Sequence, residues 1–142
     1  MCIRDSATAG EILDTRSHRG IVSYDPTELV ITARCGTPLA QLVQVLDAAQ
    51  QMLPCEPPAF GDSATVGGMI ACGLSGPRRP WSGSVRDFVL GTRVITGQGK
   101  LLRFGGEVMK NVAGYDLSRL MAGSYGSLGL ITEVSLLSLI HI

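Results

Sequence analysis

Two dense clusters of glycine constrain this chain more than any other feature. Five glycines lie among the sixteen residues from Gly61 to Gly76, and three more lie at positions 123, 126 and 129. Glycine loses more conformational freedom on folding than other residues, so this density indicates backbone in unusual conformations or pressed close to another group. Backbone amides from two clusters can surround one large ligand, and an extended dinucleotide is the natural candidate. We therefore expect the two clusters to converge in the fold.

Length and composition indicate one globular domain, or part of one. The chain has 142 residues, 45% of them hydrophobic, and its 12 basic residues balance 12 acidic ones. This balance gives no field that would attract nucleic acid or an anionic membrane. The longest apolar run is interrupted by Glu133 and falls short of the roughly 20 residues that span a bilayer. The four cysteines lack metal-site spacing, which favours buried, reduced thiols over disulfides or metal ligands.

Both ends of the chain look foreign. The DNA that encodes Met-Cys-Ile-Arg-Asp-Ser, at 1–6, has a reverse complement that encodes Leu-Ser-Leu-Ile-His-Ile, the tail at 137–142. Such an inverted repeat resembles the transposon end sequence used to fragment DNA for sequencing. We therefore expect 1–6 and 137–142 to be a non-native sequencing-adapter translation, and we leave them out of fold reasoning. Residues 7–136 are then expected to be a partial domain, incomplete at both ends.

The first half of the chain predicts two strands and a helix. Two β-branched runs on either side of an Asp-Pro turn predict strands at 19–23 and 28–33. Thr37 is expected to cap a helix over 38–50, because proline follows at the first helical position and apolar residues recur at helical spacing.

The rest of the chain mixes helices and strands. Without strict βαβ alternation, the pattern favours an α+β fold over a doubly wound parallel sheet. The expected elements are an extended segment at 53–58, a short buried helix at 66–74, a loop at 76–83, a hairpin of strands 88–96 and 100–104, a helix that Asp116 caps and that runs to Met121, and a strand at 128–136.

Neither glycine cluster is a familiar nucleotide loop. The spacing of the second cluster is not GxGxxG, and it precedes a predicted strand instead of following one. No GxxxxGK[ST] loop is present, so no motif in the sequence supports ATP hydrolysis. His18 and His141 are the only histidines, and no GxSxG motif accompanies them. Residue patterns alone therefore assign no catalytic residue and no metal site.

Several motifs in combination resemble the PCMH-type FAD-binding domain of the vanillyl-alcohol oxidase superfamily. They are Ser-Ala-Thr-Val-Gly-Gly at 63–68, Gly76, Ser-Gly at 82–83, Asp-Phe-Val-Leu-Gly at 87–91 and the segment 123–133. The stretches at 53–58, 75–87 and 110–116 are most similar to bacterial glycolate oxidase FAD-binding subunits. The resemblance covers nearly all of residues 13–136.

The resemblance implies a noncovalent FAD held between two α+β subdomains. Backbone N–H groups of Thr65, Gly67 and Gly68 would bind phosphate or flavin oxygens, and Ile131 would offer backbone groups to the adenine. The alternative is that the glycines only allow tight packing of strand turns. The cofactor-binding residues that the resemblance implies are Pro58, Ser63, Ala64, Thr65, Gly67, Gly68, Gly76, Gly83, Gly126, Gly129 and Ile131.

The activity that the resemblance implies is FAD-dependent oxidation of a 2-hydroxy acid. The flavin accepts a hydride while a base takes the hydroxyl proton and an arginine holds the carboxylate. Arg78, Arg79 and Arg86 are the clustered candidates for this carboxylate clamp or for contact with an acidic partner, and solvated surface arginines are the alternative. Trp81 is expected to stack on flavin or a partner, or else to anchor the core.

The resemblance also implies partners, namely a catalytic flavoprotein subunit and an iron–sulfur subunit of a glycolate oxidase complex. It places the protein in the cytoplasm, or at the inner membrane through those partners. Two alternatives remain open: a fragment of a self-sufficient D-lactate-type FAD dehydrogenase, and a non-catalytic scaffold subunit of the same fold. The intact glycines at 67, 68, 76 and 129 argue against the scaffold. Family members carry a glycine-rich phosphate loop upstream of the segment that matches Leu13, so this fragment alone is expected to bind FAD weakly or not at all.

Overall fold

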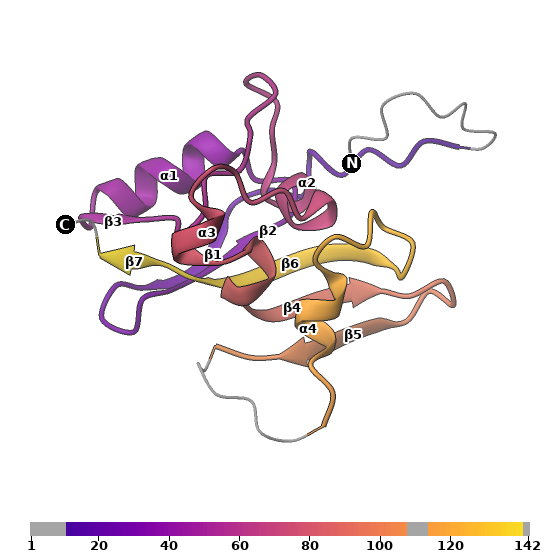
Figure 1. Cartoon of the computed structure of the whole chain (residues 1–142). Helices are drawn as coiled ribbons and strands as arrows, with labels where there is room; N and C mark the ends of the chain where they lie inside the picture. The colour runs from indigo at the N-terminus through magenta and orange to yellow at the C-terminus, as the bar shows by residue number, and fades with distance from the viewer. Residues whose placement is uncertain (1–10, 108–113, 141–142) are drawn as a thin grey trace.

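A five-stranded antiparallel sheet forms the centre of the computed structural model, which describes residues 11–107 and 114–140. The strand order is β1-β2-β6-β4-β5, so the last long strand lies between two hairpins (Figure 1). The mixed α+β class predicted from the sequence is confirmed. The strands are β1 (Ile21–Asp25), β2 (Val30–Arg34), β4 (Val89–Ile95), β5 (Leu101–Gly105) and β6 (Leu130–Leu137).

Helices cover one face of this sheet and bury its apolar side chains. Ile31, Val134 and Leu136 point from β2 and β6 into a core that also contains Leu42 of α1 and Ile70 of α2. The alternating residues of the same strands face the other side, which is polar. The helices are α1 (Leu39–Asp47), α2 (Val66–Cys72), α3 (Arg79–Ser82), the 3₁₀ helix η1 (Val85–Phe88) and α4 (Leu117–Met121).

Helix α1 is shorter than predicted, and its predicted cap is wrong. Pro38 occupies the N-cap position without a side-chain hydrogen bond. The Thr37 hydroxyl instead accepts the N–H of Gly20 at 2.9 Å and donates to the Gly20 carbonyl at 3.2 Å. Thr37 is fully buried, so its hydroxyl must be paired inside the protein, and this long-range pairing replaces the local cap.

Helix α2 begins at Val66 as predicted, and α4 begins after Asp116, its predicted cap. The Thr65 hydroxyl accepts the N–H of Gly68 at 3.1 Å, and α2 ends at Gly73 in the left-handed conformation. Asp116 accepts the N–H of Arg119 at 3.0 Å at the start of α4. The loop predicted at 76–83 is wrong in part, because it contains the short helix α3, whose first turn carries a proline with its φ already helical.

The predicted foreign tail takes part in the fold. Leu137 ends β6, and β7 (Leu139–Ile140) pairs antiparallel with β3 (Gln51–Met52). Ser138, which lies between β6 and β7, is buried, and its hydroxyl donates to Oε1 of Gln51 at 2.6 Å. Strand pairing depends on backbone groups that almost any sequence supplies, so the non-native origin of residues 137–142 stays a prediction.

Candidate cofactor site

The two glycine clusters meet, as the sequence predicts. The N–H of Gly123 donates to the carbonyl of Ile70 at 2.9 Å, and the N–H of Tyr125 donates to the carbonyl of Ala71 at 2.9 Å. Both acceptors lie in α2, which the first cluster builds. A Cβ atom on Gly73 would lie only 3.0 Å from Cα of Gly123. Two segments about fifty residues apart in the sequence therefore form one junction without side chains between them.

The first turn of α2 is also pressed against the end of the sheet. The N–H of Gly67 donates to the Cys35 carbonyl at 2.8 Å, and the N–H of Cys35 donates to the Thr132 carbonyl at 2.8 Å. A Cβ on Gly67 would lie 2.7 Å from Cβ of Cys35, a distance that real side chains do not adopt. Gly67 is therefore required for packing, which supports the alternative interpretation at this position.

The backbone N–H groups at the start of α2 have other hydrogen-bond partners than predicted. The N–H groups of Gly67 and Gly68 were expected to face a ligand, but they donate to the Cys35 carbonyl and to the Thr65 hydroxyl. This part of the prediction is wrong, because contact with the end of β2 pairs the Gly67 N–H and the helix cap pairs the Gly68 N–H. Whether these residues border the cofactor stays a prediction.

Of the three backbone N–H groups predicted to bind the cofactor, only that of Thr65 has no hydrogen-bond partner in the described residues. It forms an antiparallel bridge with Pro38 in which the flanking pairs, Leu39 with Ala64 and Val66 with Thr37, make the hydrogen bonds. The N–H of Thr65 has no partner within residues 11–107 and 114–140. An unpaired backbone N–H of this kind can donate to a phosphate or flavin oxygen.

The remaining predicted residues divide between an exposed loop and tightly packed turns. Pro58 and Ser63 are exposed on the loop that rises above the helices before α2 (Figure 1). Gly76 has a φ of 75°, and a Cβ there would overlap the Glu56 carbonyl, so glycine is needed for both conformation and space. The others are placed as follows: Ala64 is half-buried before α2, Gly83 ends α3, Gly126 lies exposed in the turn before β6, Gly129 packs on Val94, and Ile131 is buried in β6.

All three arginines that are candidates for a carboxylate clamp are exposed. One of them is already paired with a carboxylate, because Nε of Arg78 lies 3.4 Å from Oε1 of Glu56. Trp81 is 83% exposed, so the expectation that it anchors the core is wrong. The short helix α3 lies on the outside of the fold and presents the indole to solvent.

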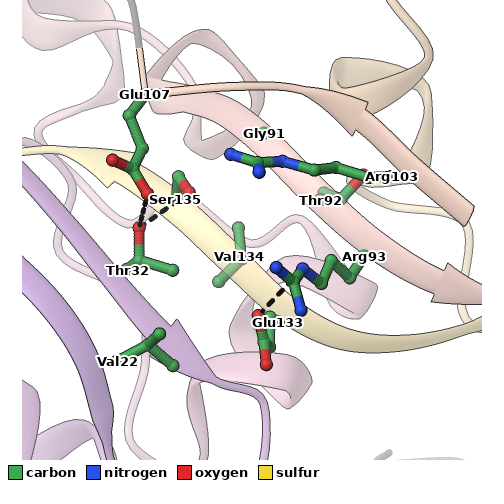
Figure 2. A pocket seen from close by; sticks show the side chains of 10 residues that line it. All are labelled: Val22, Thr32, Gly91, Thr92, Arg93, Arg103, Glu107, Glu133, Val134 and Ser135. Carbon is green, nitrogen blue, oxygen red and sulfur yellow. Dashed lines mark hydrogen bonds and ion pairs between the residues drawn. The ribbon is translucent and has the colours of Figure 1, made fainter.

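A second polar feature, which sequence reasoning missed, lies on the open face of the sheet (Figure 2). Nε of Arg93 lies 3.2 Å from Oε2 of Glu133, and the hydroxyls of Thr32 and Ser135 are 2.8 Å apart. The hollow that they line, together with Glu107, has a volume of about 40 Å³. That is room for a few water molecules, since one needs at least about 10–15 Å³, and it is far too small for a dinucleotide. The signal in the sequence is the alternation of polar residues in β6, which is uninformative until the strand partners are known.

Burial makes the thiols of Cys35 and Cys55 unreactive. It raises the pKa of Cys35 to about 12 and that of Cys55 to about 11. Both therefore remain protonated near neutral pH and are poor nucleophiles. The predicted burial is confirmed for these two, whereas Cys72 is half-buried and Cys2 lies outside the described residues. Within the described ranges no cluster of three or more His, Cys, Asp or Glu residues is placed to hold a metal ion, and none of the helices described is long and apolar enough to cross a membrane.

The family of the chain is shown by comparison with known proteins. Residues 2–105 match the sequence model of the FAD binding domain family, which is most of the chain. The chain therefore belongs to the FAD binding domain family. The N–H of Thr65, unpaired within the described residues, fits this cofactor, because the pyrophosphate of a dinucleotide needs N–H donors.

Among individual relatives, the glycolate oxidase subunit GlcE of Escherichia coli (strain K12) is 76% identical over 127 residues, covering 89% of this chain and 36% of the relative. The glycolate oxidase subunit GlcD of Bacillus subtilis (strain 168) is 34% identical over 87% of this chain and 26% of its own length. A D-lactate dehydrogenase of Anaerostipes hadrus is 35% identical over 92% of this chain and 27% of its own length. The chain thus spans between a quarter and a little over a third of these relatives.

The fold agrees with a solved structure of the same kind. An alkyldihydroxyacetonephosphate synthase structure superposes with a TM-score of 0.71 and 25% identity, over 88% of this chain and 22% of that one. This chain resembles that protein in the FAD-binding fold.

Proposed function

We propose that this chain is part of an FAD-binding subunit of a glycolate oxidase complex that oxidises 2-hydroxy acids. The observation that supports this proposal most strongly is the 76% identity to the glycolate oxidase subunit GlcE over 127 residues. Identity to the D-lactate dehydrogenase of Anaerostipes hadrus is 35%, which makes a self-sufficient D-lactate-type dehydrogenase the second candidate. A scaffold subunit without flavin is the third, and the match of residues 2–105 to the FAD binding domain family speaks against it.

Bound FAD would supply the redox chemistry by taking a hydride from the carbon that bears the substrate hydroxyl. The part of this chain is to hold and orient the cofactor. We assign Thr65 N–H as a donor to a phosphate or flavin oxygen, and the exposed loop with Pro58 and Ser63 as a wall of the site. Gly67 and Gly76 act through packing, because their missing side chains let α2 and the following turn approach neighbouring backbone.

The proposed partners are a catalytic flavoprotein subunit and an iron–sulfur subunit. The protein then works in the cytoplasm, or at the inner membrane through those partners. We also propose that residues 7–136 are the native part of the chain and that 1–6 and 137–142 are adapter-derived. Reading the gene from unfragmented DNA tests this last point, and finding either hexapeptide encoded in the intact gene refutes it.

The function is tested on the full-length protein, expressed alone and together with its two partner subunits. Expected results are a flavin absorbance spectrum, release of FAD on denaturation, and oxidation of glycolate that requires the partners. A colourless protein that still assembles would support the scaffold, and oxidation of D-lactate by the subunit alone would support the second candidate. To test the assigned donor, Thr65→Pro removes both the N–H and the hydroxyl that caps α2, while Thr65→Ala removes the hydroxyl alone. Loss of FAD from the first variant only is expected, and equal FAD content refutes the assignment.

A further inference from the structure

Helix α2 is too short to be stable by itself. It has seven residues, Val66–Cys72, whereas isolated helices shorter than about 12–15 residues are only marginally stable in water. The glycines at 67 and 68 lower its helix propensity further. Its first turn is held by the chain that follows β2, where the N–H of Val66 donates to the Thr37 carbonyl at 2.9 Å. The stability of α2 therefore depends on contacts with distant parts of the chain.

The other end of α2 is completed by a turn from the second glycine cluster. The last carbonyls of a helix have no partner within the helix. In α2 those of Ile70 and Ala71 accept the N–H groups of Gly123 and Tyr125, each at 2.9 Å. Both acceptor residues are buried, so water replaces these hydrogen bonds poorly when they break. We call residues 122–127 the capping turn, because they cap a helix about fifty residues away in the sequence.

The capping turn has a backbone conformation that it would not keep alone. Its φ angles are 80° at Gly123, 53° at Tyr125 and 78° at Gly126. The value at Tyr125 is strained, because residues with a Cβ atom rarely adopt the left-handed region. Within the described residues, the other N–H groups of the capping turn donate only inside the turn or to α4. The helix and the turn each supply hydrogen bonds that the other lacks, so opening one should open both.

We propose that α2 and the capping turn form one cooperative unit, which opens and closes as a whole while the five-stranded sheet stays folded. Thr65, whose hydroxyl caps the start of α2, lies at the opposite end of this unit from the capping turn. A ligand that binds only the closed form shifts the whole unit toward that form. A contact at Thr65 therefore also stabilises the capping turn. This last step rests on the proposed function, which assigns the Thr65 N–H to the cofactor, whereas the cooperative unit does not.

The test is hydrogen exchange of the full-length protein without FAD, measured by mass spectrometry on segments 66–73 and 122–127. In Gly123→Ala the new Cβ would meet no atom within 4 Å, so the change adds only backbone strain at a φ of 80°. Exchange is expected to become at least about fivefold faster in both segments. The matched control is Gly99→Ala, in the turn between β4 and β5, where φ is 74° and a Cβ is equally free of contacts. It should accelerate exchange in that hairpin and leave α2 unchanged.

A second variant changes the strain in the opposite direction and does not endanger folding. Tyr125→Asn keeps the N–H that binds the Ala71 carbonyl, and asparagine adopts the left-handed conformation more readily than tyrosine. Exchange is therefore expected to slow in α2 as well as in the capping turn. With either variant, a change in the capping turn without a change in α2 overturns the proposal.

The remaining outcomes separate this inference from the proposed function. Acceleration of α2 by Gly99→Ala to the same extent as by Gly123→Ala would show general destabilisation and would also overturn the cooperative unit. Added FAD is expected to slow exchange in both segments. Slowing in α2 alone overturns the unit. If FAD binds and slows neither segment while the variants still act on both, the assignment of Thr65 is wrong and the cooperative unit stands.

Discussion

Replacing Gly67 by alanine should destabilise the protein, whereas the same change at Gly68, the next residue of α2, should not. A Cβ at position 67 would lie 2.7 Å from Cβ and 2.9 Å from the carbonyl oxygen of Cys35, which is buried at the end of β2. Neither atom is the end of a flexible side chain, so helix or strand must shift. Overpacking of this kind costs about 1–3 kcal/mol. At Gly68 the nearest atom is the Thr65 hydroxyl oxygen at 3.3 Å, and little has to move.

The two variants form a matched pair. Both gain about 1 kcal/mol of helix propensity when alanine replaces glycine inside a helix, so the difference between them isolates the packing cost. We expect Gly67→Ala to be less stable than Gly68→Ala by about 1–3 kcal/mol, with Gly68→Ala equal to or above the unaltered protein. Denaturant unfolding of the full-length protein measures this, and FAD content is measured in parallel. Equal stability of the two variants would refute the packing argument. If Gly67→Ala were stable but free of FAD, the glycine would serve ligand approach instead.

Three further outcomes are expected. Thr65→Ala should lower the free energy of unfolding by about 1 kcal/mol through loss of the α2 cap, and Thr65→Ser should restore it; thermal or denaturant melts compare them. Hydrogen bonds from the Ser84 hydroxyl and N–H lower the pKa of Asp87 in the folded protein. The stability that this carboxylate contributes is therefore fully present above its unfolded-state pKa of about 3.9, and it is lost as pH falls through the lower folded-state pKa. Asp87→Asn should therefore flatten the acid side of the stability profile, and an unchanged profile contradicts the assignment. Cys35 and Cys55 should resist alkylation at pH 8 until the protein unfolds, as peptide mass spectrometry would reveal; rapid labelling of either in the folded state would contradict their raised pKa values.

Local signals predicted local structure well. Asp116 caps the helix that it was expected to cap, because a capping bond joins residues three apart and needs no knowledge of the rest of the fold. Thr37 failed for the converse reason: its hydroxyl is paired with Gly20, seventeen residues away, and no short-range pattern contains that contact. The exposure of Trp81 likewise depends on where α3 lies relative to the sheet.

By itself, the sequence determined the family, the α+β class and the convergence of the two glycine clusters, because motif chemistry and glycine density are properties of short segments. Tertiary structure decided what each glycine does. It showed that Gly67 packs on Cys35 and that the N–H groups of Gly67 and Gly68 are already paired, whereas the N–H of Thr65 has no partner in the described part of the chain. The physical reason is that a backbone donor is available to a ligand only when no other part of the chain has reached it, and that depends on contacts between residues far apart in sequence.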